Sequence, residues 1–338
     1  MHSTSSDSNA QGAGRWAIAG QIELDGTIEL NKGSDATATG VVSYQIVSCD
    51  AGEFTVQLSE VTMSTSQATN TGTITPVDIA RTFIIGSRHV IGTPAKTVSR
   101  CAFPAYELTD ATTLTVSRSA HHSIQLRAKM QAVTWAAWTG VLVYNDRVTL
   151  NGDMSSKISK AHGVANIDPS YTWLVTSMMH QTSGLEQCSV AANLLDSSGV
   201  ASSTNIYFQR YDQVTSYTTI AAWFLIRFPD NSITISNVDS TDSGTGTLDI
   251  VTPGIPMYPD GVIYDWTNAT NGTGTAFARH AWYFSGIVLL TAGANAGKIN
   301  YVSLARGYSG LACVNVSTFI DLGNFKPQNP SMALGVNF

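Results

Sequence analysis

The sequence predicts an all-β protein of tandem β-sandwich or jelly-roll-like modules behind a flexible N-terminal arm. Three observations predict it: the composition, the spacing of alternating apolar segments, and a segment pattern that returns along the chain. Charged residues make up 12% of the 338 residues, about half of the roughly 25% that is usual. Ser, Thr, Asn and Gly take their place, which favours sheets and turns over helices, because exposed helix surfaces are normally rich in Glu, Lys, Arg and Gln.

Residues 1–40 are expected to form the arm and a small hairpin. The start, "MHSTSSDSNAQGAGRW", is polar and lacks the basic and apolar regions of a signal peptide, so we expect no secretory export. The stretch "QIELDGTIEL" then places alternating apolar residues on both sides of Asp25-Gly26. Asp-Gly in that setting predicts a hairpin, because both central residues of a type I′ turn need positive φ.

From residue 41 onward the apolar pattern becomes regular and strand-like. In "FTVQLSEVTM" the alternation shifts by one residue at Ser59-Glu60, which predicts a β-bulge or a turn. In "IQLRAKMQAVTW", apolar and polar residues alternate from Ile124 to Ala132. That strand is expected to have one face in a core and one in water.

The same segments return later in the same order, which indicates a duplicated module. "IARTFIIGSRH" matches "PSYTWLVTSMMH", with Ser87 matching Ser177; "CAFPAYELTD" matches "CSVAANLLD"; and "TLTVSR" matches "IYFQR". A more diverged third copy is expected, in which "YVSLARG" stands in for "CSVAANL". The predicted modules are therefore residues 41–140, 141–230 and 231–338.

One stretch near the start of the third module is dense in turn-forming residues. "NVDSTDSGTGTLDIVTPGIPMYPDG" is predicted to be a linker or a long loop. Its Asp239, Asp242 and Asp249 raise the question of calcium, since carboxylates and carbonyls wrap hard cations. The spacing of an EF-hand is missing, so an ordinary acidic loop is favoured. The pair His121-His122 is interpreted as polar turn residues, and no metal site is predicted.

Several function classes are disfavoured. A net charge of −6 without a run of Lys or Arg argues against a nucleic-acid partner. The most apolar segment, "TTIAAWFLIRF", is only strand-sized, so no membrane insertion is expected. "GYSGLA" resembles a nucleophile elbow but has glycine directly after the serine, and no carboxylate pair stands out. We expect no enzyme, no catalytic residues and no cofactor. The four scattered cysteines are expected to be reduced, with their disulfide state left open.

Three tryptophans are candidates for partner or glycan contact. Trp138 and Trp266 are flanked by turns, which favours exposure, and an aromatic face packs well on a sugar ring. Trp16 lies in the arm, where it would anchor the protein to a neighbour.

Two arginines are further candidates. Arg118 and Arg210 close equivalent strands and follow the equivalent aspartates Asp110 and Asp196. They predict either a repeated partner contact or a repeated Asp–Arg pair that ties a loop to a strand, and the pair is favoured.

The succession of "ELTDATTLTVSR" and "IQLRAKMQAVTW" resembles a β-module of tailed-bacteriophage structural proteins. The resemblance covers residues 42–138 well and 139–228 moderately. It implies a noncatalytic virion protein, a head fibre, capsid decoration or tail-associated component such as a tail fibre, assembled in the host cytoplasm as a homo-oligomer with other virion proteins. The module is also similar to H-type lectin sandwiches, so the alternative is a module that binds a cell-surface glycan or receptor. A self-polymerising surface filament subunit is the third hypothesis.

Overall fold

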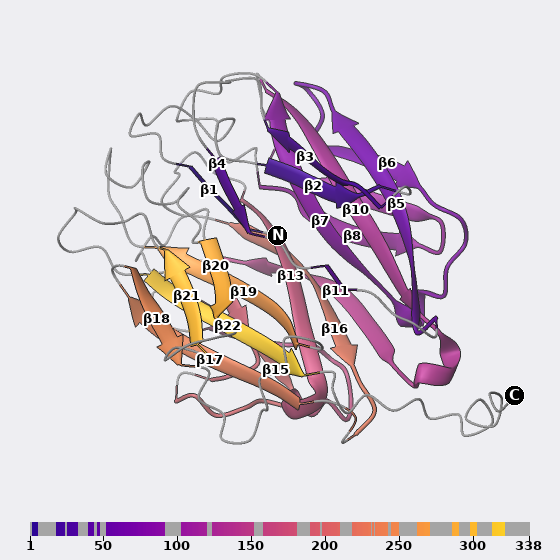
Figure 1. Ribbon diagram of the computed structural model, residues 1–338. Coiled ribbons are helices and arrows are strands. Elements are labelled where there is room, and N and C mark those ends of the chain that lie inside the picture. The colour runs from indigo at the N-terminus through magenta and orange to yellow at the C-terminus, as the bar shows by residue number, and fades with distance from the viewer. Residues whose placement is uncertain are drawn as a thin grey trace, which may run out of the picture.

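A computed structural model shows that the chain is all-β, as predicted, with antiparallel sheets of two or three strands and only short 3-10 turns among the described residues (Figure 1). The structure describes residues 2–5, 18–23, 26–32, 40–43, 46–47, 52–91, 103–119, 124–151, 158–180, 190–196, 198–209, 218–230, 232, 234–242, 245–249, 262–270, 286–290, 298–302 and 313–321.

Three sets of six strands have the same pairing. We letter the strands of each set a to f in chain order; a, f and c form one sheet with f in the middle, and b, e and d form the other with e in the middle. Unit 1 comprises β5 (Phe54–Met63), β6 (Thr69–Thr73), β7 (Thr82–Ile91), β8 (Ala105–Asp110), β9 (Thr113–Ser117) and β10 (Gln125–Trp135). Unit 2 comprises β11 (Leu142–Leu150), β12 (Ile158–Ala161), β13 (Thr172–His180), β14 (Ala191–Asn193), β15 (Asn205–Gln209) and β16 (Thr219–Arg227). Unit 3 comprises β17 (Thr234–Asp242), β18 (Thr245–Asp249), β19 (Val262–Thr270), β20 (Gly286–Leu290), β21 (Lys298–Val302) and β22 (Cys313–Asp321).

These three units fall inside the predicted ranges 41–140, 141–230 and 231–338. Whether each range folds as a separate domain stays a prediction. The third repeat was matched to the wrong strand, however. "YVSLARG" begins in the central strand β21, whereas "CSVAANL" contains the edge strand β14, whose equivalent is β20. The apolar pattern of β20 and β14 differs too much for the sequence to align them.

The N-terminal segment contains four more strands. They are β1 (His2–Ser5), β2 (Ile18–Ile22), β3 (Ile28–Lys32) and β4 (Gly40–Ser43). The predicted hairpin is confirmed, since β2 pairs with β3 and Gly26 has a φ of 83°. The turn is longer than two residues, because the Glu23 amide donates to the Thr27 carbonyl at 2.8 Å. β1 pairs with β4, so part of the predicted arm is strand.

The predicted irregularity at Ser59-Glu60 is wrong. β5 pairs with β10 without a register shift from Phe54 to Met63. Val61 and Met63 face the core, while Val56, on the opposite face, is 43% exposed. The alternation in the sequence shifts because this regular strand has apolar residues on both of its faces.

The predicted linker is also wrong in its first half. Residues 234–242 and 245–249 form β17 and β18, so Asp239, Asp242 and Asp249 lie in strands. The β-branched residues Thr, Val and Ile in these segments favour a strand despite the Gly and Ser content. The Gly- and Pro-rich second half lies outside the described residues.

In units 1 and 2, strand c begins directly after a capped 3-10 turn. The turns are η2 (Ile79–Arg81) and η5 (Pro169–Tyr171), and the Asp78 and Asp168 carboxylates accept hydrogen bonds from the Ala80 and Ser170 amides at 3.0 and 2.8 Å. A third turn, η4 (Ala137–Thr139), joins units 1 and 2.

The main core runs continuously from unit 1 into unit 2. Trp135 packs edge-on against Phe228 at 5.4 Å, and Phe83 against Trp173 at 5.4 Å. β16 is buried on both faces from Thr219 to Ile226, because one face lines the sandwich of unit 2 and the other covers unit 1. Such a strand reads as a continuous apolar run rather than an alternating one.

One contact mode links all four sets of strands. Strand d of one unit lies against strands c and f of the next: β8 contacts β13 and β16, and β14 contacts β19 and β22. At the start of the chain β2 contacts β7 and β10 in the same way, and at the end β20 contacts β1 and β4 (Figure 1). By pairing and by contacts, β1 to β4 therefore occupy the places of strands c, d, e and f, and we call them the N-terminal unit.

Candidate interaction surfaces

Two equivalent serines hold the first two junctions. The Tyr106 amide of β8 donates to Ser177 Oγ at 2.8 Å, and Ser177 Oγ donates back to the Tyr106 carbonyl at 3.4 Å. The Gly20 amide of β2 donates to Ser87 Oγ at 3.1 Å, and Ser87 Oγ donates back to the Gly20 carbonyl at 2.9 Å. Ser87 lies opposite Lys129 and Ser177 opposite Ala222, so both serines occupy one position of strand c. The match of Ser87 with Ser177 made from the sequence is thus confirmed by their shared contact.

The strands that these serines bind are equivalent as well. With Gly20 aligned to Tyr106, the sequence "AGQI" of β2 aligns with "AYEL" of β8. Ala19 and Ala105 both have 0% exposure, because each lies against the face of the following sheet. The signal was present in the sequence, but four residues of such common types are too short a pattern to be noticed.

The two junctions differ in chemistry. Between units 1 and 2 the contact is apolar, and Ala105 packs in one cluster with Met179, Ile220 and Ala222. A peripheral ion pair joins Arg147 to Glu107 at 3.3 Å. An apolar contact of this kind is typical of parts that stay together.

Beneath the β2–β3 hairpin the equivalent positions are polar. His89, Arg127 and Lys129 replace Met179, Ile220 and Ala222. The Lys129 side chain is only 1% exposed and its ammonium forms an ion pair with Glu29 of β3. The Lys129 hydrogen bond lowers the pKa of Glu29 to about 2. Because a buried ammonium needs a partner, the hairpin and Lys129 are mutually dependent.

His89 gives this junction a pH dependence. Burial, followed by the charges of Arg127 and Lys129, lowers the pKa of His89 from 6.5 to about 4, and Glu29 opposes the shift. The folded state holds His89 neutral, whereas the unfolded state binds a proton on it below about pH 6.5. The contribution of His89 to stability is therefore complete above pH 6.5 and is lost as the pH falls to about 4.

We expect the free energy of unfolding to fall by roughly 2 kcal/mol from this group between pH 7 and pH 4. His89→Met, which copies Met179 of unit 2, should flatten that part of the profile. Urea unfolding at a series of pH values measures both curves. Burial also lowers the pKa of His162, so the variant keeps a residual slope. Parallel curves for the two proteins would contradict the assignment to His89.

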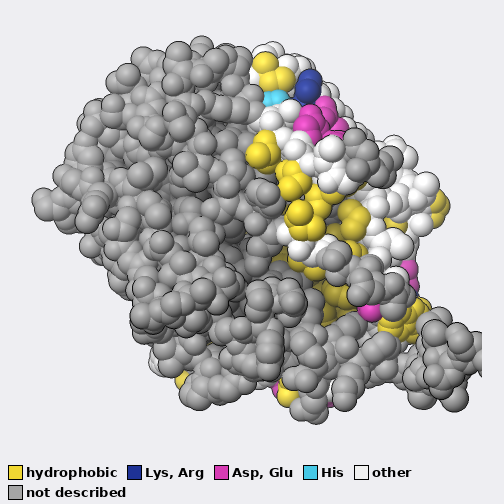
Figure 2. All heavy atoms as spheres, in the orientation of Figure 1, with side chains coloured by type: hydrophobic (Ala, Val, Ile, Leu, Met, Phe, Trp, Pro, Cys, Tyr) yellow, Lys and Arg dark blue, Asp and Glu magenta, His cyan; other side chains and the backbone are white. Residues whose placement is uncertain are grey.

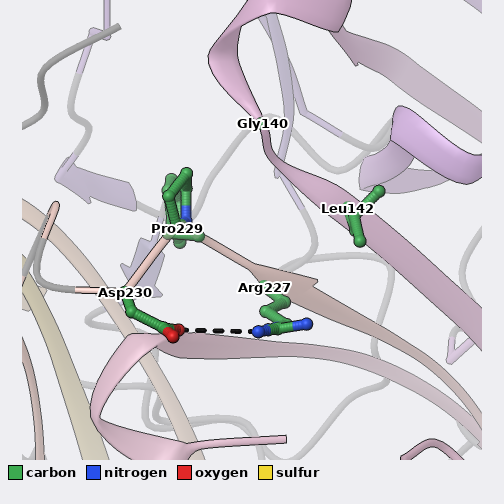
Figure 3. Close-up of a pocket in the computed structure, with 6 residues that line it drawn as sticks. Gly140, Leu142, Arg227, Pro229 and Asp230 are labelled. Atoms are coloured by element: carbon green, nitrogen blue, oxygen red, sulfur yellow. Dashed lines mark hydrogen bonds and ion pairs between the residues drawn. The ribbon is translucent and has the colours of Figure 1, made fainter. Parts of the chain in front are cut away.

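A small pocket lies where units 1 and 2 join. It has a volume of about 230 Å³ and is lined by Gly140, Leu142, Arg227, Phe228, Pro229 and Asp230. Figure 3 shows the side chains of Arg227 and Asp230 pointing toward one another, at 3.5 Å between Nη2 and Oδ1. Ligand pockets usually hold about 300–1,000 Å³. The pocket is therefore below the usual size of a small-molecule site.

Arg118 is placed inside the fold, with 1% exposure. Its guanidinium donates to the backbone carbonyls of Gln67, Ile124 and Ser64 at 3.0, 3.0 and 2.5 Å. In this position it joins the loop after β5 to the start of β10 and presents no surface for a partner. The sequence shows the arginine, but only the folded loops supply the carbonyls that it binds.

The aspartates that precede the two arginines close turns. Asp110 accepts hydrogen bonds from the Thr112 amide and hydroxyl at 2.7 and 2.9 Å, which lowers the pKa of its carboxyl. Asp196 accepts from the Ser198 and Val200 amides, both at 2.8 Å. The repeated aspartate is thus explained by turn geometry.

The remaining predicted contact residues are separated along the chain. Trp138 lies in η4 and is partly exposed, two residues before Gly140 of the pocket. Trp266 lies in β19, and its side chain is outside the described part of the structure. Trp16, Arg210 and the His121-His122 pair lie outside the described residues, as do the side chains of all four cysteines.

Among the described residues, no three His, Cys, Asp or Glu side chains lie close enough together to hold a metal ion. In the same part of the chain no helix has the length and apolar character needed to cross a membrane. A scan against protein-family models finds no match, and a search of the curated proteins finds none either.

Proposed function

We propose that this protein is a noncatalytic structural protein that works through protein–protein assembly. The observation that carries the proposal is the repeated junction, in which strand d of one unit lies against strands c and f of the next. The junction between units 1 and 2 combines an apolar cluster, the hydrogen bonds between Ser177 and the Tyr106 backbone, and aromatic contacts. Because the core runs from unit 1 into unit 2, these two units are packed together as parts of one body, which suits a scaffold.

The resemblance of the sequence to a β-module of tailed-phage structural proteins supports a role in a virion. We propose a tailed-phage virion, in which the chain is a head fibre, decoration or tail-associated component, contacts other virion proteins and forms homo-oligomers. The low content of charged residues, 12% of the chain, favours such docking, because charged residues are depleted at the centres of protein interfaces.

The proposal can be tested on phage particles purified from the organism that encodes the chain. Mass spectrometry of density-purified particles should find its peptides at a fixed copy number, and immunogold labelling should place it at one part of the particle. Failure to find it in particles, with the protein abundant elsewhere in the cell, would contradict the virion role.

One observation favours a second candidate, glycan binding. Trp138 is partly exposed in the turn that leads into the pocket, where Arg227 and Asp230 offer polar groups for hydroxyls. Aromatic faces and such polar groups together recognise sugars. A glycan array with the wild type and Trp138→Ala separates the candidates: binding that the substitution abolishes would replace the scaffold role with a lectin role.

A further inference from the structure

The β2–β3 hairpin meets unit 1 through its polar face. Gln21 lies opposite Glu29 and Ala19 opposite Asn31, and positions two residues apart on paired strands share one face of a hairpin. Ala19 is fully buried and Glu29 pairs with Lys129 of β10, so this is the face that lies against unit 1. The hairpin therefore brings two amides and a carboxylate to the junction beside Ala19.

The surface of unit 1 beneath the hairpin carries positive charge. The Lys129 side chain is 1% exposed, and the carboxylate that pairs with it, Glu29, belongs to the hairpin. Arg127 pairs with Glu60 of its own sheet at 3.0 Å. Figure 2 shows histidine, basic and acidic side chains close together at the end of the described surface where Figure 1 draws β3 and β7. The charge of Lys129 is therefore balanced as long as the hairpin stays in place.

His89 lies in the same junction and is poorly placed to hold a proton there. It is 5% exposed, and its Nδ1 atom has no hydrogen-bond partner among the described residues. The charged groups that face it in the described elements are Arg127 and Lys129 of β10 and Glu29 of β3, and Glu23 of β2 is hydrogen-bonded to Glu29. A proton on His89 would thus add a positive charge beside two cations. Such a charge is costly when buried and is tolerated in water.

We propose that the β2–β3 hairpin is a latch that acid opens, so that protonation of His89 and Glu29 releases the hairpin from unit 1 while the units stay folded. Opening brings water to the face of β7 and β10 that carries Lys129. The pKa values have the matching sign: those of His89 and Glu29 are lowered to about 4 and about 2 in the closed state, so both groups take up protons more readily when the latch is open. The latch is independent of the assembly role proposed above.

Two matched amides test the latch. The Gly20 and Tyr106 amides donate to the equivalent serines of the two junctions. Their hydrogen exchange in the full chain, followed by NMR from pH 7 to pH 4 and corrected for the intrinsic effect of pH, gives a protection factor for each amide. We expect the protection of Gly20 to fall by about 100-fold relative to that of Tyr106, because each pKa difference of one between the two states corresponds to a tenfold change.

A double variant removes the groups that make the latch sensitive to acid. His89→Met/Lys129→Ala gives this junction the residues that unit 2 has at the equivalent positions, Met179 and Ala222. The protection of Gly20 in this variant should no longer fall between pH 7 and pH 4.5. His162→Gln is the control for the loss of a buried histidine, since His162 lies in unit 2, and it should keep the wild-type profile. Circular dichroism checks that both variants fold.

Three results would overturn the latch. Parallel loss of protection at Gly20 and Tyr106 in the wild type would mean that acid opens the whole fold rather than the hairpin. A Gly20 amide that is as well protected at pH 4 as at pH 7 would mean that the hairpin stays closed. A double variant that folds and keeps the wild-type profile would mean that the buried charges do not control opening.

Discussion

Replacing Arg118 by methionine is expected to lower the free energy of unfolding by about 4 kcal/mol. The guanidinium is buried and donates to three backbone carbonyls that belong to two different loops. Methionine keeps much of the volume but leaves those carbonyls buried without their donors, and each lost charge-assisted hydrogen bond is costly. Chemical denaturation monitored by tryptophan fluorescence measures the difference.

Arg127→Met is the control for the loss of a positive charge. Arg127 lies on neighbouring β10, pairs with Glu60 at 3.0 Å, and both side chains are about 40% exposed. Exposed ion pairs contribute at most about 1 kcal/mol. If the two variants lost similar amounts of stability, the carbonyl contacts of Arg118 would not be the reason for its burial.

Gly86→Ala is expected to destabilise the protein by about 3 kcal/mol through overpacking. Gly86 lies in β7 against the ring of Tyr106, and a methyl group at that position would overlap the ring atoms. Tyr106 is buried, with 5% exposure. Thermal and urea unfolding of the purified variant measure the loss.

Unit 2 suggests the matched rescue. Where unit 1 has Gly86 and Tyr106, the equivalent positions of unit 2 hold Thr176 and Ala192. The double variant Gly86→Ala/Tyr106→Ala should therefore lose less stability than the sum of the two single variants, with a coupling of about 1–3 kcal/mol. Strictly additive losses would show that the glycine is needed for another reason.

The sequence predicts the fold class because period-two alternation and turn residues are local signals. The repeat was equally accessible, since units 1 and 2 keep Ser87 and Ser177 and the turn aspartates Asp110 and Asp196 in matching places. What the sequence does not show is which surfaces meet. Tyr106 and Ser177 are 71 residues apart, and their contact follows from the way two sheets stack rather than from any local pattern.

The burial of Arg118 could not be predicted from the sequence for a related reason. Arg118 follows a strand in the same way that an exposed arginine would, and its burial depends on carbonyls that two loops bring together. Leu30 shows the opposite case, because its alternation is that of a core residue although the structure leaves it 43% exposed. Periodicity identifies the face on which a side chain lies, but not whether a partner covers that face.

The order of the junctions has a consequence for synthesis of the chain on the ribosome. β8 emerges before the strands of unit 2 that it contacts, and β14 before those of unit 3, so each of these contacts can form as soon as the following unit is made. The contact of β20 with β1 and β4 has the opposite order, because β20 is made after the strands that it contacts. β1 and β4 are made before β20 and must wait until residue 290 has been translated before this neighbour arrives. Nascent chains therefore expose the face of the β1–β4 sheet that β20 covers until β20 is made, and during that time this face is accessible to chaperones and to neighbouring chains on the same messenger.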